Sequence, residues 1–197
     1  MDDSTAISEV RKVLENGSKF SISSTDDFNK CVEHIVGLLN DAALLFRSGS
    51  YATSAFMSIA AIEESGKSEM GLYIKEGAGK KVKKDPLRDH KKKEKVAVLH
   101  TVAMGQRLID ALGKERIDEL YRLTYSGGLK RLREDALYWD IKNGRMELPR
   151  EVVDKVFARD LLLFSIEVFD DRLVGYTNYS MELSITTDKL FQEIADL

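Results

Sequence analysis

Two charged side chains interrupt the apolar face of a helix that the sequence predicts over residues 50–75. Glu63 and Lys67 stand one turn apart. At about 100° per residue, both fall on or near a stripe of apolar side chains formed by Ala52, Phe56, Ile59 and Met70. An exposed pair at this spacing contributes only about 0.2–0.5 kcal/mol, whereas burying a charge costs several kcal/mol per ion. The position of Glu63 and Lys67 indicates either a functional site or a structural ion pair.

A similar interruption occurs in the next predicted helix, which begins just after Pro86. His90 lies in line with Ala97, Thr101, Met104 and Leu108, and Lys93 lies about one sixth of a turn from that line. A histidine at the end of an apolar face is either a packing residue or a proton-transfer group. We expect His90 and Lys93 to meet Glu63 and Lys67 where the two helices pack, which would place an imidazole beside a carboxylate and two ammonium groups.

Positive charge is concentrated in residues 80–95 of a chain whose formal net charge is −3. The basic residues of this segment are Lys80, Lys81, Lys83, Lys84, Arg88, Lys91, Lys92, Lys93 and Lys95, against Asp85, Asp89 and Glu94. Such a run is either a solvated surface or a patch that attracts phosphate. The partner it predicts is RNA or another polyanion.

A third cluster occupies residues 131–140, where Arg133, Tyr138, Trp139 and Asp140 stand close together. One interpretation is a helix end with Arg133 and Asp140 paired or capping. The other is a surface on which aromatic rings among cations stack on bases.

The remaining pattern is helical. The chain has 197 residues, 43% of them apolar, and 2 prolines, which favours one all-α domain folded as an antiparallel helical bundle. Periodicity and stop signals predict helices over residues 4–16, 25–47, 50–75, 87–112, 114–138 and 149–169, the fifth with an interruption at residues 127–128. Residues 76–86 are expected to form a loop, and residues 140–148 a loop or hairpin turning at Asn143-Gly144.

Composition also limits the function classes. Cys31 is the one cysteine, so no intrachain disulfide can form, and no Cys/His spacing suits zinc. The acidic start of the chain is unlike a signal peptide, and the longest apolar stretch, residues 161–164, is far too short to span a membrane. We therefore expect a cytoplasmic protein without a metal or other cofactor.

The ordered series of short motifs resembles the AbiV-type abortive infection family of the HEPN superfamily, over about residues 30 to 175. The residues that carry the resemblance are Asn40-Asp41-Ala42, Ser48-Gly49-Ser50-Tyr51-Ala52, Ala60-Ala61-Ile62-Glu63-Glu64-Ser65-Gly66-Lys67, His90-Lys91-Lys92-Lys93 and Arg133 to Asp140, followed by Gly144 and Pro149. The resemblance implies an HEPN-like core over residues 25–175, with an N-terminal helix (1–17) before it and a helical extension (176–197) after it.

The resemblance further implies an antiphage protein, usually a homodimer, whose better-known superfamily members are metal-independent ribonucleases of toxin and defence systems. It implies that the family's polar positions are Glu63, Glu64, Lys67, His90, Lys93, Arg133, Tyr138 and Asp140. In many HEPN ribonucleases an arginine precedes a histidine with four to six residues between them. No arginine stands in that relation to His34, His90 or His100 here.

Two functions remain open from the sequence. In the first, the protein arrests growth or translation on infection by metal-independent cleavage of RNA, with tRNA, mRNA or the ribosome as its partner. Glu63, Lys67, His90 and Arg133 would be catalytic, and the substrate would be held by Glu64, Lys93, Tyr138, Asp140, Lys80, Lys81, Lys83, Lys84, Arg88, Lys91 and Lys92. In the second, a non-catalytic helical dimer inhibits the translation machinery or binds a phage protein that triggers it. A less favoured third reading makes Glu63, Glu64, His90 and Asp140 ligands of a divalent metal.

Overall fold

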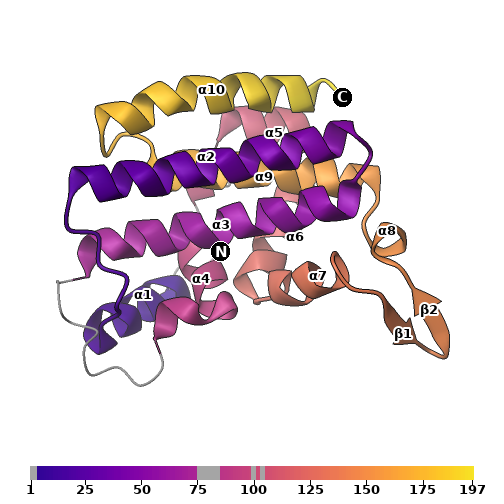
Figure 1. The fold of residues 1–197 in the computed structure, drawn as a ribbon, viewed down its shortest axis with the longest axis horizontal. Helices are drawn as coiled ribbons and strands as arrows, with labels where there is room; N and C mark the ends of the chain where they lie inside the picture. The colour runs from indigo at the N-terminus through magenta and orange to yellow at the C-terminus, as the bar shows by residue number, and fades with distance from the viewer. Residues whose placement is uncertain (1–3, 75–84, 99–100, 103–104) are drawn as a thin grey trace.

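The chain folds as a helical bundle with one small β-hairpin (Figure 1). The computed structural model describes residues 4–74, 85–98, 101–102 and 105–197. Its elements are α1 (Ser4–Asn16), α2 (Thr25–Arg47), α3 (Tyr51–Tyr73), the 3-10 turn η2 (Pro86–Arg88), α4 (His90–Ala97), α5 (Gln106–Leu112), α6 (Lys114–Tyr125), α7 (Leu129–Asp135), β1 (Asp140–Lys142), β2 (Arg145–Glu147), α8 (Pro149–Val152), α9 (Lys155–Leu173) and α10 (Asn178–Ala195). The predicted all-α fold class is confirmed.

Helix α3 lies at the centre of the bundle, packed against α2, α9 and α4. The turn at residues 48–50 joins α2 and α3, and Gly49 adopts a φ of 81° there, a conformation that glycine reaches without strain. In Figure 1 α10 lies along the far side of α2 and α9, and α4 lies on the opposite side of α3. One flank of α3 therefore contacts α4 and α7.

Helix α9 is buried on nearly every side, including Leu161, Phe164 and Phe169, none of which has exposed surface. An apolar helix of this kind can form the core of a bundle, but not an amphipathic surface. Among the described residues, no helix is long and apolar enough to cross a membrane.

Several predicted boundaries agree with the structure. The first three helices begin and end within about two residues of their predicted limits. The hairpin turns at Asn143 and Gly144, whose φ angles of 52° and 76° suit a tight two-residue turn. Helices α6 and α7 are separated at Gly127, where φ is 76°.

The helix predicted over residues 87–112 is wrong, because the chain leaves the helix after Ala97. Val98 is extended, with φ −113° and ψ 104°, and is fully buried. Gly105 then passes so close to α9 that a Cβ atom there would overlap Glu167 Oε1. Thr101 therefore lies outside α4, in a short turn, while Met104 falls outside the described residues. The burial of Val98 in the core therefore decides where the helix ends.

Two other helices are shorter than predicted. The helix expected from Pro149 to Phe169 breaks after Val152, because the Asp154 side chain accepts the Phe157 N–H at 2.7 Å and starts a new helix there. Helix α7 ends at Asp135, so Tyr138 lies beyond it. The loop predicted at residues 76–86 lies largely outside the described residues, as do Lys80, Lys81, Lys83 and Lys84.

The crossing of α3 and α4 depends on Gly66. A Cβ atom at this position would lie 2.7 Å from the backbone N and Cα of Ala97, as well as from its Cβ. We expect Gly66→Ala to destabilise the protein by about 1–3 kcal/mol and to push α4 away from α3, because the obstructing atoms include backbone. Urea unfolding of the purified variant measures this loss.

Gly37 in α2 provides the matched control, since a Cβ atom there would meet nothing within 4 Å. Gly37→Ala should raise stability by about 0.5–1 kcal/mol, because alanine favours the helix when nothing obstructs it. Equal effects of the two substitutions would contradict a close contact at Gly66.

Candidate functional site

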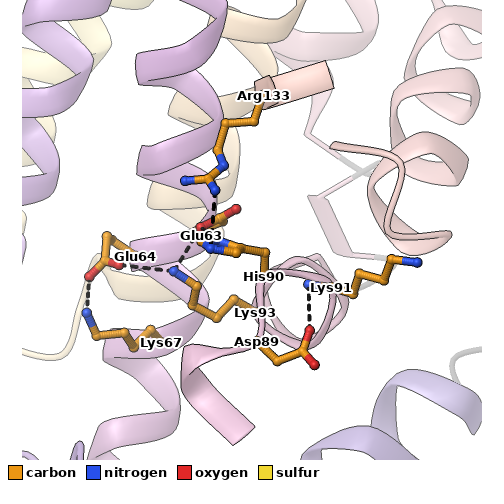
Figure 2. A network of polar contacts seen from close by, with 8 residues as sticks. All are labelled: Glu63, Glu64, Lys67, Asp89, His90, Lys91, Lys93 and Arg133. Carbon is orange, nitrogen blue, oxygen red and sulfur yellow. Dashed lines mark hydrogen bonds and ion pairs between the residues drawn. The ribbon is translucent and has the colours of Figure 1, made fainter. Parts of the chain in front are cut away.

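A polar cluster occupies the junction of α3, α4 and α7 (Figure 2). Helix α3 supplies Glu63, Glu64 and Lys67, and α4 supplies His90 and Lys93. Arg133 reaches the same place from α7. The structure thus brings together six of the residues that the sequence singled out, which we call the polar cluster.

The position of His90 follows from the start of its helix. The Asp89 side chain accepts the backbone N–H of Lys91 at 3.1 Å and caps α4, so His90 is the first helical residue. Its side chain turns back toward α3, where Nδ1 lies 2.7 Å from Glu63 Oε2. Its other ring nitrogen, Nε2, lies 3.2 Å from an Nη2 of Arg133.

These two contacts define the proton on the ring. A guanidinium has only N–H donors, so Nε2 accepts from Arg133. Nδ1 therefore carries the proton in the neutral ring and donates it to Glu63. The arrangement orients the imidazole with a buried carboxylate behind it and a lone pair on Nε2. The His90 side chain is 30% exposed whereas that of Glu63 is 3% exposed.

Glu63 is paired twice. Besides its hydrogen bond with His90 it forms an ion pair with Lys93, whose Nζ lies 2.8 Å from the same oxygen and whose side chain is 9% exposed. The second oxygen, Oε1, is buried and makes no hydrogen bond within the described residues. Lys93 is the cation that compensates this buried carboxylate, and removing the cation of a buried ion pair costs about 3–5 kcal/mol.

The neighbouring carboxylate, Glu64, lies on the flank of α3. It contacts Lys67 directly, and its other oxygen lies 3.4 Å from Lys93 Nζ. Burial alone would raise the pKa of Glu64, but its hydrogen bond and charge interaction with Lys67, reinforced by Lys93, bring that pKa below the usual value. Glu64 therefore stays ionised and links Lys67 to the buried part of the cluster.

Glu94 is a further member that the sequence reasoning missed, having counted it only as an acidic residue of the basic segment. Its side chain is fully buried. Burial, then the charge of Glu63, raises its pKa to about 7, against a smaller lowering effect of the Leu129 and Lys130 backbone amides and of Arg133. Although these amides lie close, neither carboxyl oxygen forms a hydrogen bond to the described residues. The sequence does contain a signal for its burial: Glu94 follows His90 by four residues, so the two side chains lie on the same face of a helix.

The charge of the cluster is positive when Glu94 is protonated and His90 is neutral. Three cations, Lys67, Lys93 and Arg133, then face two carboxylates, Glu63 and Glu64. The Nε of Arg133 is buried and makes no hydrogen bond to the described residues. A phosphate group is the ligand that a net positive charge with a guanidinium suits.

The other predicted binding residues lie apart from the cluster. Tyr138 is 67% exposed, and the Asp140 carboxylate accepts its neighbour's N–H, from Ile141, at 2.7 Å rather than pairing with Arg133. The hairpin that begins at Asp140 projects away from α4 in Figure 1. Within the described part of the chain, no group of three or more His, Cys, Asp or Glu side chains is arranged to hold a metal ion.

The basic residues of η2 and α4 other than Lys93 have different surroundings. The exposed Arg88 guanidinium lies 5.9 Å from the centre of the Phe20 ring. Lys91 is exposed and its stem passes over Gly127, where a Cβ atom would meet it at 2.9 Å. Lys92 is half-buried. The hydrogen bonds of His90 within the described residues go to Glu63 and Arg133 and not to these side chains.

The helical bundle is of the HEPN type. A family model of this class, described as AbiV, matches residues 25–168. The chain belongs to the AbiV family. The match includes the polar cluster and all the elements from α2 to most of α9.

No curated protein and no solved structure matched the chain. Membership of the AbiV family assigns the protein to abortive infection, a form of defence. The geometry of the polar cluster indicates how the protein acts.

Proposed function

We propose that the protein is a metal-independent endoribonuclease that arrests growth or translation during phage infection. The observation that carries this proposal is the placement of His90, which is accessible to solvent between buried Glu63 and the Arg133 guanidinium. An imidazole with a carboxylate behind one nitrogen and a cation at the other has the groups that a proton transfer next to a phosphate requires.

The reaction we propose uses the RNA 2′-hydroxyl as the nucleophile. His90 Nε2 takes the hydroxyl proton while the 2′-oxygen bonds to the adjacent phosphorus, and the bond from phosphorus to the 5′-oxygen breaks. The imidazolium then returns the proton to that 5′-oxygen. The products are a 2′,3′-cyclic phosphate and a 5′-hydroxyl.

Glu63 and Arg133 support this step from either side of the ring. Glu63 accepts the hydrogen bond from Nδ1–H and stabilises the imidazolium as it forms, in the manner of the carboxylate of a catalytic triad. Arg133 must stop donating to Nε2 before the ring can act as a base. Its N–H groups then donate to the phosphate oxygens, on which negative charge develops. Lys67, half-exposed beside Glu64, adds positive charge at the edge.

Incubation of the purified protein with total RNA in EDTA, with sequencing of the fragment ends, tests the proposal. A short RNA and its copy with a single 2′-deoxy substitution at the cut position form the matched pair. We expect cleavage of the first, with cyclic phosphate ends, and none of the second. Intact RNA under all conditions, or equal cleavage of both substrates, would reject this reaction.

A second candidate function is binding to another protein, either a second copy of this chain, the translation machinery or a phage protein. The observation that favours it is the set of exposed apolar side chains on and beside the hairpin, Leu137, Tyr138, Trp139, Ile141 and Met146. Exposed apolar groups gathered in this way are typical of protein interfaces. In this case the polar cluster would fix helix packing instead of catalysing a reaction.

A further inference from the structure

A pocket of about 420 Å³ is lined by Glu64 and Lys67 but not by His90. Its walls are the irregular segment before α2, the first three turns of α2, and α3. The volume is within the range of small-molecule sites, about 300–1,000 Å³. Apart from Glu64 and Lys67, the residues that line the pocket have no role in the cleavage proposed above.

The pocket wall formed by residues 18–22 is held in place from two directions. The buried Asp85 carboxylate accepts the Ser18 hydroxyl at 2.8 Å and the Lys19 N–H at 2.7 Å, while also accepting the Leu87 N–H that opens η2. At the other end the Ile22 N–H donates to the Gly71 carbonyl at 2.8 Å. The wall is therefore preformed, and Asp85 connects it to the segment leading into His90.

Cations surround the pocket. Lys19, Lys30 and Lys67 line it, with His34 beside them, against two carboxylates, Asp27 and Glu64. Lys30 is held only by an exposed ion pair with Asp27 at 3.2 Å, an interaction of about 0.2–1 kcal/mol that a phosphate can replace. The balance of charge favours an anionic ligand.

Other lining groups suit a nucleotide better than a bare anion. The Phe20 ring is part of the wall and holds the Lys67 ammonium 4.9 Å from its centre. Ser68, which is 4% exposed, also lines the pocket. An aromatic ring, a hydroxyl and ammonium groups together match the base, sugar and phosphate of one nucleotide.

We infer that this pocket binds one nucleotide of the RNA strand, next to the nucleotide at which His90 acts. Contacts connect the two places without a break: Lys67 contacts Glu64, Glu64 lies 3.4 Å from Lys93 Nζ, and Lys93 lies 2.8 Å from the Glu63 oxygen that holds His90. The inference rests on the proposed RNA cleavage for its substrate. The pocket would set which base lies beside the cut.

Cys31 allows the pocket to be tested without any cleavage assay. It lines the pocket, it is half-buried, and it is the one cysteine of the chain. The experiment measures the rate at which N-ethylmaleimide, an uncharged reagent, alkylates Cys31, with and without ligand. The ligands are a 2′-O-methyl oligoribonucleotide that cannot be cleaved, a mixture of the four nucleoside monophosphates, and inorganic phosphate.

At a nucleotide concentration about ten times the Kd, occupancy should slow alkylation about tenfold. We expect this protection from the oligonucleotide and from the monophosphates, and much less from inorganic phosphate. Lys30→Glu should lose it, because that substitution replaces a phosphate-binding cation with a repelling charge. Lys189→Glu, an equal charge change on exposed α10, is the matched control and should keep it.

Unchanged alkylation with every ligand, equal protection by inorganic phosphate, or equal loss in both variants would overturn the inference. Protection by monophosphates but not by the oligonucleotide would also overturn it, because the pocket would then hold a free nucleotide. Failure of the proposed function is seen separately: RNA that stays intact while nucleotides protect Cys31 rejects the cleavage and keeps the nucleotide site. Cleavage without protection rejects the pocket alone.

Discussion

His90→Ala is expected to slow RNA cleavage about 10²–10⁴-fold, the usual contribution of a general acid or base, while the protein stays folded. The fold should survive because Glu63 keeps Lys93 as its partner at 2.8 Å when the imidazole is removed. We expect a loss of about 1 kcal/mol from the missing hydrogen bond, which lowers Tm by about 2–4 °C in a protein of this size. Single-turnover cleavage and thermal unfolding of the same preparation measure the two effects.

Lys189→Ala is the control, since Lys189 is an exposed residue of α10, which packs against α2 and α9 and lies across the bundle from the cluster (Figure 1). Cleavage by this variant should remain close to that of the wild type. If His90→Ala loses stability and growth arrest together, or cleaves as fast as Lys189→Ala, the histidine is a packing residue. The protein-binding function would then be the better account.

Helical periodicity was sufficient to select the side chains that face one another between α3 and α4. Glu63, His90 and Lys93 were chosen because they break apolar stripes, and the structure places both partners within 2.8 Å of Glu63. Gly66, between Glu63 and Met70 on the same helix, allows the close approach of α4 to α3. Lys67 differs: it contacts Glu64 instead of Glu63, because it lies toward the flank of the helix.

Helical periodicity does not predict contacts between segments that are distant in the sequence. Arg133 follows His90 by 43 residues, and the bond between them depends on how α7 packs beside α4. The missing Arg-x4–6-His spacing therefore says little about whether an arginine reaches the histidine. Likewise, the end of α4 at Ala97 depends on the burial of Val98, which is decided by tertiary packing rather than by local propensity.

Glu94 illustrates a second limit. Its place in a lysine-rich run indicates an exposed residue, yet it has no exposed surface at all. Helical position relative to His90 puts it on the inner face, but only the structure shows that α7 closes over that face. The strongest electrostatic anomaly of the site thus belongs to a residue whose surroundings in the sequence suggest an ordinary surface charge.

Glu94→Gln is expected to stabilise the protein at alkaline pH and to leave its stability in acid nearly unchanged. The pKa of Glu94 is raised from 4.5 to about 7, first by burial and then by the charge of Glu63. Between these two values the folded protein binds more protons than the unfolded chain, so stability falls as pH rises through this window. At about 1.4 kcal/mol per pKa unit, the ionised side chain costs about 3 kcal/mol above pH 8, and glutamine removes that cost.

Urea unfolding between pH 4 and pH 9 measures the difference in free energy between Glu94→Gln and the wild type. Glu167, Asp170 and Asp171 also have pKa values raised mainly by burial, so the wild type loses stability with rising pH for several reasons. Those contributions are common to both proteins and cancel in the difference. An exposed carboxylate on α2 provides the control: Glu33→Gln should follow the wild-type profile. A difference that does not grow between pH 4.5 and pH 7 would mean that Glu94 is ionised in the folded protein throughout that range, and the polar cluster would then carry no net positive charge near neutral pH.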